Sequence, residues 1–285
     1  MKEEQKGYIE LILFSLFNGL VGVVVKLTHN INATSIVFFR AVIASVSLFI
    51  FMMFVKKLRE LRFQDPLNTI LVGAFQGFSI LLYFLALQKT SVSNALFLIY
   101  TAPIFSVFLA RIFLKEHIER KTLIGLLFSI VGIVCILDPK AFTLDSSKNI
   151  GNLFALGSGF LYAAMALIAK PLLKKVSGYY TVFWQYVVIS MLFLFLLRGS
   201  PMSEFGMNWW QLSVIGTVCT AIAFTLFMEG VKKVKAQKIF IITSLEPLVG
   251  TLAALFILQE IPTLLTIIGA VLIFTGVYFV TLHKR

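Results

Sequence analysis

The chain has 285 residues, of which 59% are hydrophobic and 13% are charged, and its mean hydropathy is +0.95. A soluble domain of this size would be about a quarter charged and a little under half apolar, so the composition excludes an ordinary soluble protein. The net charge of +12 does not indicate nucleic-acid binding, because the basic residues form short clusters between apolar runs, as in loops at an anionic membrane surface. Cys135 and Cys219 both lie inside apolar runs, so no disulfide framework, metal site or cofactor is expected.

Apolar runs divide the chain into candidate membrane helices. A helix that crosses a membrane needs about 20 mostly apolar residues. The sequence predicts an all-α integral membrane protein with ten transmembrane helices at 8–26, 33–55, 67–87, 92–114, 121–138, 150–170, 179–197, 209–230, 238–259 and 263–282. An even number of crossings places both chain ends on the same side of the membrane.

The basic residues predict which side that is. Cytoplasmic loops are enriched in Lys and Arg. The links on the N-terminal side of the membrane carry the basic clusters at 56–62, 115–121 and 232–238. The opposite links hold fewer basic residues, namely Lys89, Lys140, Lys148 and Arg198. We therefore expect a multi-pass protein of the cell (inner, cytoplasmic) membrane, with both termini cytoplasmic. Its partners would be the lipid bilayer and a small-molecule substrate, with no nucleic acid, and it would be a monomer or a homodimer.

The chain repeats itself at an offset of 144 residues. In this register Pro103 meets Pro247, Glu116 meets Glu260, Gly125 meets Gly269 and Gly132 meets Gly276. The repeat predicts two copies of five helices, at 7–138 and 149–282. Since five crossings are odd in number, the second copy would enter the membrane from the opposite side. Inverted repeats of this kind are typical of secondary transporters, which bind substrate near the midplane between the copies.

Two stretches carry a resemblance to a known family. They are TAPIFSVFLARIFLKEHIERKTLIGLLFSIVG (101–132) and LEPLVGTLAALFILQEIPTLLTIIGAVLIFTG (245–276). Each has a proline in the fourth helix of its copy, a glutamate at the end of that helix and two glycines in the fifth. The sequence thus resembles the EamA family of the drug/metabolite transporter superfamily over nearly its whole length. The resemblance implies two inverted five-helix repeats around a central cavity, with the fourth and ninth helices in its wall, and transport of small metabolites such as amino acids. The family usually has Gly before the motif glutamate, where Lys115 and Gln259 stand here.

Polar side chains near the middle of a membrane helix are energetically expensive and usually face a cavity or another helix. We expect a substrate site formed by Glu246, Arg40, Asn18, Gln76, Tyr83, Tyr162, Trp184, Gln185 and Thr220. The alternative for each is a structural role in hydrogen bonding between helices. Arg40 would bind a carboxylate, or else bond backbone carbonyls. Glu246 would bind an amine or carry a proton; its repeat equivalent is Ala102, so the repeat does not require it.

The repeated prolines and glutamates are expected to be architectural. Pro103 and Pro247 each remove a backbone donor and predict a kink that frees the carbonyl of Ile99 or Thr243, which could then contact substrate. Glu116 and Glu260 lie in the short turns after these helices. They are expected to accept hydrogen bonds from the free amides at the start of the next helix.

These features predict a secondary transporter, an exporter or a facilitator, of small polar metabolites that works by alternating access. Arg40 and Glu246 in opposite halves suggest an amino acid or a related zwitterion. The sequence has no Walker motif, so ATP is not expected as the direct energy source, and proton coupling through Glu246 is left open. A channel or a non-transporting membrane sensor is the alternative. An enzyme is not expected, since no cluster of His, Asp, Glu or Cys stands at one membrane face.

Overall fold

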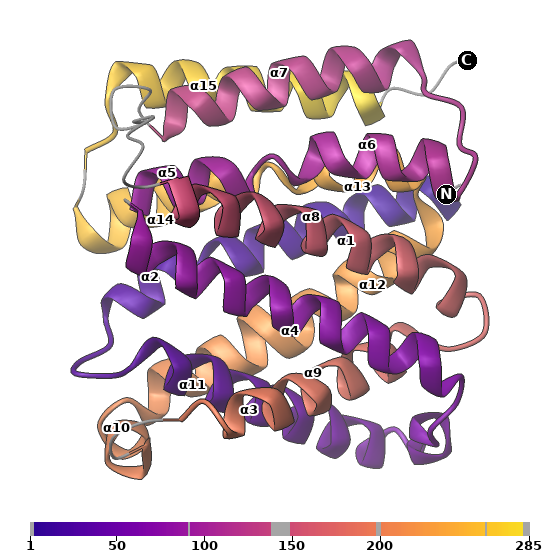
Figure 1. Cartoon of the computed structure of the whole chain (residues 1–285), viewed down its shortest axis with the longest axis vertical. Helices are drawn as coiled ribbons and strands as arrows, with labels where there is room; N and C mark the ends of the chain where they lie inside the picture. Colours follow the sequence, from indigo (N-terminus) through magenta and orange to yellow (C-terminus); the bar gives the residue numbers. More distant parts are fainter. Residues whose placement is uncertain (1–2, 91, 138–148, 198–200, 260, 282–285) are drawn as a thin grey trace.

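The computed structural model describes residues 3–90, 92–137, 149–197, 201–259 and 261–281, and within these ranges every regular element is a helix. The helices run back and forth across the view in stacked layers (Figure 1). In the N-terminal half they are α1 (Glu3–Gly19), α2 (Val21–Lys26), α3 (Ala33–Phe54), the 3-10 turn η1 (Leu58–Leu61), α4 (Pro66–Lys89), α5 (Val92–Ile99), α6 (Ala102–Phe113) and α7 (Arg120–Ile136). In the C-terminal half they are α8 (Asn149–Leu172), α9 (Gly178–Leu194), α10 (Pro201–Met207), α11 (Trp209–Gly216), the π-helical segment η4 (Thr217–Ile222), α12 (Ala223–Lys233), α13 (Ala236–Thr243), α14 (Glu246–Leu258) and α15 (Leu264–Thr281).

Seven helical stretches of the described chain are long and apolar enough to cross a membrane, at Glu3–Lys26, Ala33–Phe54, Pro66–Lys89, Asn149–Leu172, Trp209–Lys233, Ala236–Leu258 and Leu264–Thr281. The other three expected crossings are shorter helices: 92–114 is divided between α5 and α6, 121–138 is α7, and 179–197 is α9. Large apolar side chains such as Phe54, Phe195 and Phe256 are more than three-quarters exposed, as suits a surface in contact with lipid. The chain is a multi-pass, all-α membrane protein.

The two repeated prolines stand where helices are interrupted. α5 ends at Ile99 and α6 begins at Ala102, while α13 ends at Thr243 and α14 begins at Glu246. In each case the proline is the second residue of the new helix, where its missing amide breaks no hydrogen bond. Its ring would clash with the carbonyl four residues earlier in a continuous helix, so the chain ends one helix and starts another. The sequence predicted kinks, and the structure has full breaks of two residues.

The repeated glycines lie at one helix crossing. α7 and α15 run side by side along one edge of the molecule (Figure 1). Gly125 faces Gly276 and Gly132 faces Gly269, and a Cβ added to any of the four would lie 2.6–2.8 Å from the carbonyl oxygen of its partner. Small residues of this kind let two membrane helices approach until their backbones touch. The glycine pair in each fifth helix is therefore explained by this single contact.

The departure from the family pattern at Lys115 and Gln259 has a structural consequence. Lys115 has a φ of 54° and Gln259 a φ of 57°, so both end their helix in the left-handed region. Glycine reaches this region without a steric penalty, whereas a side chain brings Cβ too close to the following carbonyl oxygen. Glycine is thus the residue that this turn favours, and here the chain holds two strained residues instead.

Replacing Lys115 by glycine is expected to raise the free energy of unfolding by about 1 kcal/mol, because the left-handed strain is removed and only part of the gain is lost to the more flexible unfolded chain. Arg111, exposed in the same helix α6, is the control, since glycine in a regular helix costs about 1 kcal/mol. Unfolding titrations of the purified protein in mixed micelles would measure both. A Lys115→Gly variant as destabilised as Arg111→Gly would contradict the explanation.

Candidate substrate-binding site

A cavity of about 650 Å³ lies between the two halves of the chain, within the size range of small-molecule sites. At one end its lining includes the exposed residues Gly22, Lys26 and Ile261, so the cavity opens there. At its other end the lining consists of buried side chains such as Phe224 and Phe240. The opening lies at the ends of α2 and α14, away from the N-terminal end of α1 (Figure 1).

Both helix breaks contribute to the wall of this cavity. Tyr100 and Ser244 occupy the breaks, and both line the cavity together with Ile99 and Thr243, the residues whose carbonyls the prolines leave free. Glu246 is the first residue of α14. A carboxylate at this position is stabilised by the free amides and the positive dipole end of the helix. The break in the ninth expected span therefore brings the Glu246 carboxyl group to the cavity wall.

The carboxylate of Glu246 is held by a neutral side chain. Asn18 Nδ2, at the end of α1, donates a hydrogen bond to Glu246 Oε2 over 2.6 Å. In the part of the chain that the structure describes, no Lys or Arg lies within ion-pair distance of Glu246. Tyr100 and Tyr162 line the same cavity. The carboxyl group thus lines the cavity without a direct ion pair to any cation of the described chain, although the charge of Arg40 in the same lining acts on it.

Arg40 is the corresponding cation. It lies in α3, lines the cavity, and donates from Nε to Thr220 Oγ1 in η4 over 3.1 Å. Among the described residues no carboxylate pairs with its guanidinium. A charge removed from water without a counter-ion is costly, and a partner of opposite charge offsets that cost. One cavity therefore contains a carboxylate and a guanidinium, each bonded by the protein through neutral groups.

The cavity brings together six of the nine residues expected in the site, namely Asn18, Arg40, Gln76, Tyr83, Tyr162 and Glu246. Gln76 is buried, and its Oε1 has no hydrogen-bond partner among the described residues. Thr220 lies behind Arg40 and is not in the lining.

Trp184 and Gln185 lie elsewhere. Trp184 Nε1 donates to the carbonyl of Leu61 over 2.9 Å, and its ring packs on Phe63, so it joins α9 to the η1 turn. Gln185 is fully buried in α9, and neither atom of its amide group has a hydrogen-bond partner in the described chain. Neither residue is in the cavity lining. Trp184 was expected in the site as the repeat equivalent of Arg40, and Gln185 because it stands beside Trp184; helix packing gives both residues other neighbours.

Tyr100 and Ser244 are wall residues that were not expected from the sequence, whereas Thr243 was expected there only through its free carbonyl. Their positions carried a usable signal, because each lies within four residues before a repeated proline, where the helix must open. Tyr100 and Ser244 are also equivalent in the 144-residue register. Hydropathy does not mark these positions, since a break in a membrane helix leaves the run of apolar residues unchanged.

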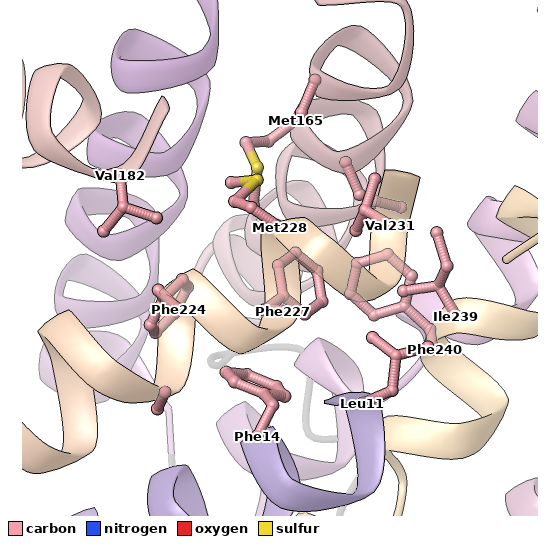
Figure 2. Packing of buried hydrophobic residues seen from close by; sticks show 14 of the residues in the cluster. Leu11, Phe14, Met165, Val182, Phe224, Phe227, Met228, Val231, Ile239 and Phe240 are labelled. Atoms are coloured by element: carbon pink, nitrogen blue, oxygen red, sulfur yellow. The ribbon is translucent and has the colours of Figure 1, made fainter. Parts of the chain in front are cut away.

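Aromatic side chains close the inner end of the cavity. Figure 2 shows Phe14, Phe224, Phe227 and Phe240 packed together with aliphatic neighbours from several helices. The ring centroids of Phe14 and Phe227 are 4.8 Å apart, and those of Tyr162 and Phe240 are also 4.8 Å apart. This cluster separates the cavity from the face of the molecule that holds the N-terminal end of α1.

Ion pairs join the two halves on that face, which we call the N-terminal face. Lys238, only 7% exposed, lies 3.2 Å from a Glu4 carboxylate oxygen and 3.6 Å from one of Glu119, and it donates to the Tyr8 hydroxyl over 3.0 Å. Lys235 pairs with the same Glu119 over 2.5 Å. Partial burial of Glu119 acts to raise its pKa, but Lys235 and Lys238 outweigh burial and hold that pKa below its ordinary value. Glu119 therefore stays ionised, and its pairs persist, until the pH falls below the usual range of a glutamate.

Glu116 belongs to the same face. Its carboxylate accepts hydrogen bonds from the amides of Ala236 and Gln237 over 3.0 and 3.3 Å, and lies 3.8 Å from Lys170 Nζ. It thus bonds free amides at a helix start, as a structural glutamate would. The helix is α13 of the opposite half, however, and not the next helix α7 as expected, because α13 packs against α6 beside this turn. Glu260, expected to play the same part, lies outside the described residues.

Comparisons with known proteins place the chain among transporters. The EamA-like transporter family model matches twice, at residues 5–138 and 149–282. An uncharacterized transporter of Archaeoglobus fulgidus is 32% identical over 74% of this chain and 76% of its own length. The uncharacterized transporter YyaM of Bacillus subtilis is 22% identical over 95% of this chain and 92% of its own length.

A mammalian solute carrier and a solved crystal structure are also similar to this chain. Solute carrier family 35 member G1 of Mus musculus is 23% identical over 98% of this chain and 78% of its own length. A solved crystal structure that is 17% identical superposes with a TM-score of 0.85, covering 98% of this chain and 96% of that one, and so has the same fold. These family and relative names describe transporters rather than enzymes. The two matches cover nearly the whole chain, and the protein is a member of the EamA-like transporter family.

Proposed function

We propose that this protein is a secondary transporter of small zwitterionic metabolites, with amino acids as the leading class. The observation that carries the proposal is that Glu246 and Arg40 line one cavity between the halves and that neither forms a direct ion pair within the described chain. A zwitterion would neutralise both, with its ammonium group at Glu246 and its carboxylate at Arg40, whose planar guanidinium suits bidentate recognition. Gln76 and Tyr83 add polar contacts in the same wall.

The proposed architecture is ten crossings in two inverted repeats of five. Helix bounds support it, since α5 and α13 begin at residues 92 and 236, α6 and α14 at 102 and 246, and α7 and α15 at 120 and 264, always 144 apart. Packing supports it too. α4 packs on α8 as α1 packs on α12, while α3 meets α9, α6 meets α13 and α7 meets α15. These are the partners that a twofold axis between inverted copies would generate.

We propose that transport proceeds by alternating access, with this structure open away from the N-terminal face. The aromatic cluster and the ion pairs of Lys238 close that face, while the cavity reaches the surface at the other end. With the N-terminus in the cytoplasm of a cell membrane, the open side is the extracellular one. Substrate crosses when the halves rock, breaking the contacts at the N-terminal face and closing the present opening.

The test is a matched set of three probes: leucine, leucine methyl ester and N-acetyl-leucine. The first has both charges, the second only the ammonium and the third only the carboxylate. Counterflow in proteoliposomes is expected for leucine, with losses of about 10- to 100-fold for each derivative, since each leaves one buried charge unmatched. Flux of a different metabolite class with none for a panel of amino acids would refute the substrate class. Binding without counterflow, or single-channel currents, would favour a sensor or a channel.

A further inference from the structure

Thr220 is buried behind the cavity wall, in the one segment of described chain that forms a π-helix. η4 spans Thr217–Ile222, between α11 and α12. The equivalent stretch of the first half lies inside α4, which is a continuous α-helix from Pro66 to Lys89. Single π turns within α-helices are frequent at functional sites, because they re-aim the residues that they contain. This departure from repeat symmetry falls at the residue that bonds Arg40.

The single proton of the Thr220 hydroxyl group is already used in a hydrogen bond within the helix. The hydroxyl donates to the carbonyl of Ile215, five residues earlier, over 2.7 Å. A hydroxyl has one proton to donate and two lone pairs to accept. With that proton used within the helix, the oxygen is left as an acceptor, and Arg40 Nε donates to it over 3.1 Å. The guanidinium is thus held through Nε by Thr220, the buried Tyr186 of α9 also interacts with it, and no carboxylate of the described chain forms an ion pair with it.

Contacts at the start of η4 hold it against α3. A Cβ on Gly216 would lie 2.6 Å from Ile43 Cβ, so the two helices touch closely there. Ser47 and Thr217 share a hydrogen bond of 3.0 Å between their hydroxyl groups. Thr220 itself is fully buried and absent from the cavity lining, so a direct contact with substrate is not its role.

We infer that Thr220 is a positioning residue, which fixes the Arg40 guanidinium as the binding group for the substrate carboxylate. The inference rests on the proposed function for its ligand, and it assigns Thr220 a place in specificity different from the substrate contact expected from the sequence. Valine keeps the shape of threonine without the hydroxyl, and serine keeps the hydroxyl. Thr217 supplies a matched control in the same π segment, because it bonds Ser47 and not Arg40.

The experiment compares Thr220→Val, Thr220→Ser and Thr217→Val in the full-length protein, with binding of leucine and leucine methyl ester as the first readout. Thr220→Val is expected to weaken leucine binding about tenfold, the scale of a misplaced charged hydrogen bond, and to leave the carboxylate-free ester unchanged. Thr220→Ser should restore leucine binding, and Thr217→Val should bind both probes like the wild type. Equal losses for leucine and its ester, or the same loss in Thr217→Val, would show a general packing defect and overturn the inference.

A second readout needs no substrate. Phenylglyoxal labelling, read by peptide mass spectrometry, is expected to be faster at Arg40 in Thr220→Val than in the wild type, with Arg111 as the internal reference. If leucine does not bind the wild-type protein, the proposed substrate is wrong, and the labelling alone decides the role of Thr220. An unchanged rate at Arg40 would refute the positioning role whatever the substrate is.

Discussion

Glu246→Gln is expected to lower leucine flux by about 10- to 100-fold, because an ammonium group loses a charge-assisted hydrogen bond at a buried site. Glutamine keeps the size of glutamate and can still accept the bond from Asn18 Nδ2, so the variant removes the charge and little else. Leucine methyl ester should lose affinity to the same extent, whereas N-acetyl-leucine, which has no ammonium group, should not. Counterflow and binding in proteoliposomes would measure all three.

Glu3→Gln is the control for this variant. Glu3 is an exposed carboxylate at the start of α1, paired with Lys6 over 2.9 Å, and such pairs contribute about 0–1 kcal/mol. It should transport leucine at the wild-type rate. An equal loss for N-acetyl-leucine in Glu246→Gln would show that the carboxylate shapes the cavity rather than binding an amine.

Glu246→Gln also decides whether that carboxylate carries a proton. If it does, flux of the wild type depends on pH and the variant loses that dependence. If residual flux of the variant follows the wild-type pH profile, the proton role is wrong. Measuring flux with and without an imposed pH gradient separates a proton carrier from an amine-binding group, since only the carrier couples the two movements.

Lys238→Met is expected to open the N-terminal face. The variant leaves Glu4, Tyr8 and Glu119 without their shared cation. Removing one member of a buried ion pair destabilises the structure that holds it by several kcal/mol. Because Glu4 and Glu119 are partly exposed, the expected destabilisation of the closed N-terminal face is smaller, about 1–3 kcal/mol. This corresponds to a rise of about 10- to 100-fold in the population of the form that is open on that face. The measurement is labelling of a cysteine at Thr243, in the cavity wall, by an impermeant maleimide added on the side of the N-terminus.

Two controls make this result specific. The labelling is done in a background without Cys135 and Cys219, and Lys6→Met removes an exposed cation of the same face that pairs only locally with Glu3. Lys6→Met should label as slowly as the parent. Slow labelling of Lys238→Met as well would mean that the aromatic cluster around Phe227 closes the face by itself, and that the ion pairs are incidental.

The sequence predicted the positions of the membrane helices better than it predicted which residues line the cavity, and the difference has a physical reason. In the hydrocarbon core every backbone N–H and C=O group must be hydrogen-bonded within its own helix, so a membrane helix can be predicted from a long apolar run of residues. The lengths of the individual helices were harder to predict from the sequence. The runs at 92–114 and 238–259 gave no sign of their breaks in hydropathy, and only the repeated prolines marked them.

The depth of a polar side chain in the membrane was predictable from the sequence, whereas its hydrogen-bond partner was not. The sequence by itself determined an apolar all-helical chain, a 144-residue repeat, the presence of Glu246 and Asn18 near the middle of their spans, and that of Arg40 nearer the outer end of its span. Only the tertiary structure decided which helices meet. It placed Asn18 on Glu246, set Thr220 behind Arg40 instead of in the cavity, and turned Glu116 to the start of α13. Depth in the membrane follows from position along one helix, whereas a partner depends on the packing of two helices far apart in sequence, which no local pattern specifies.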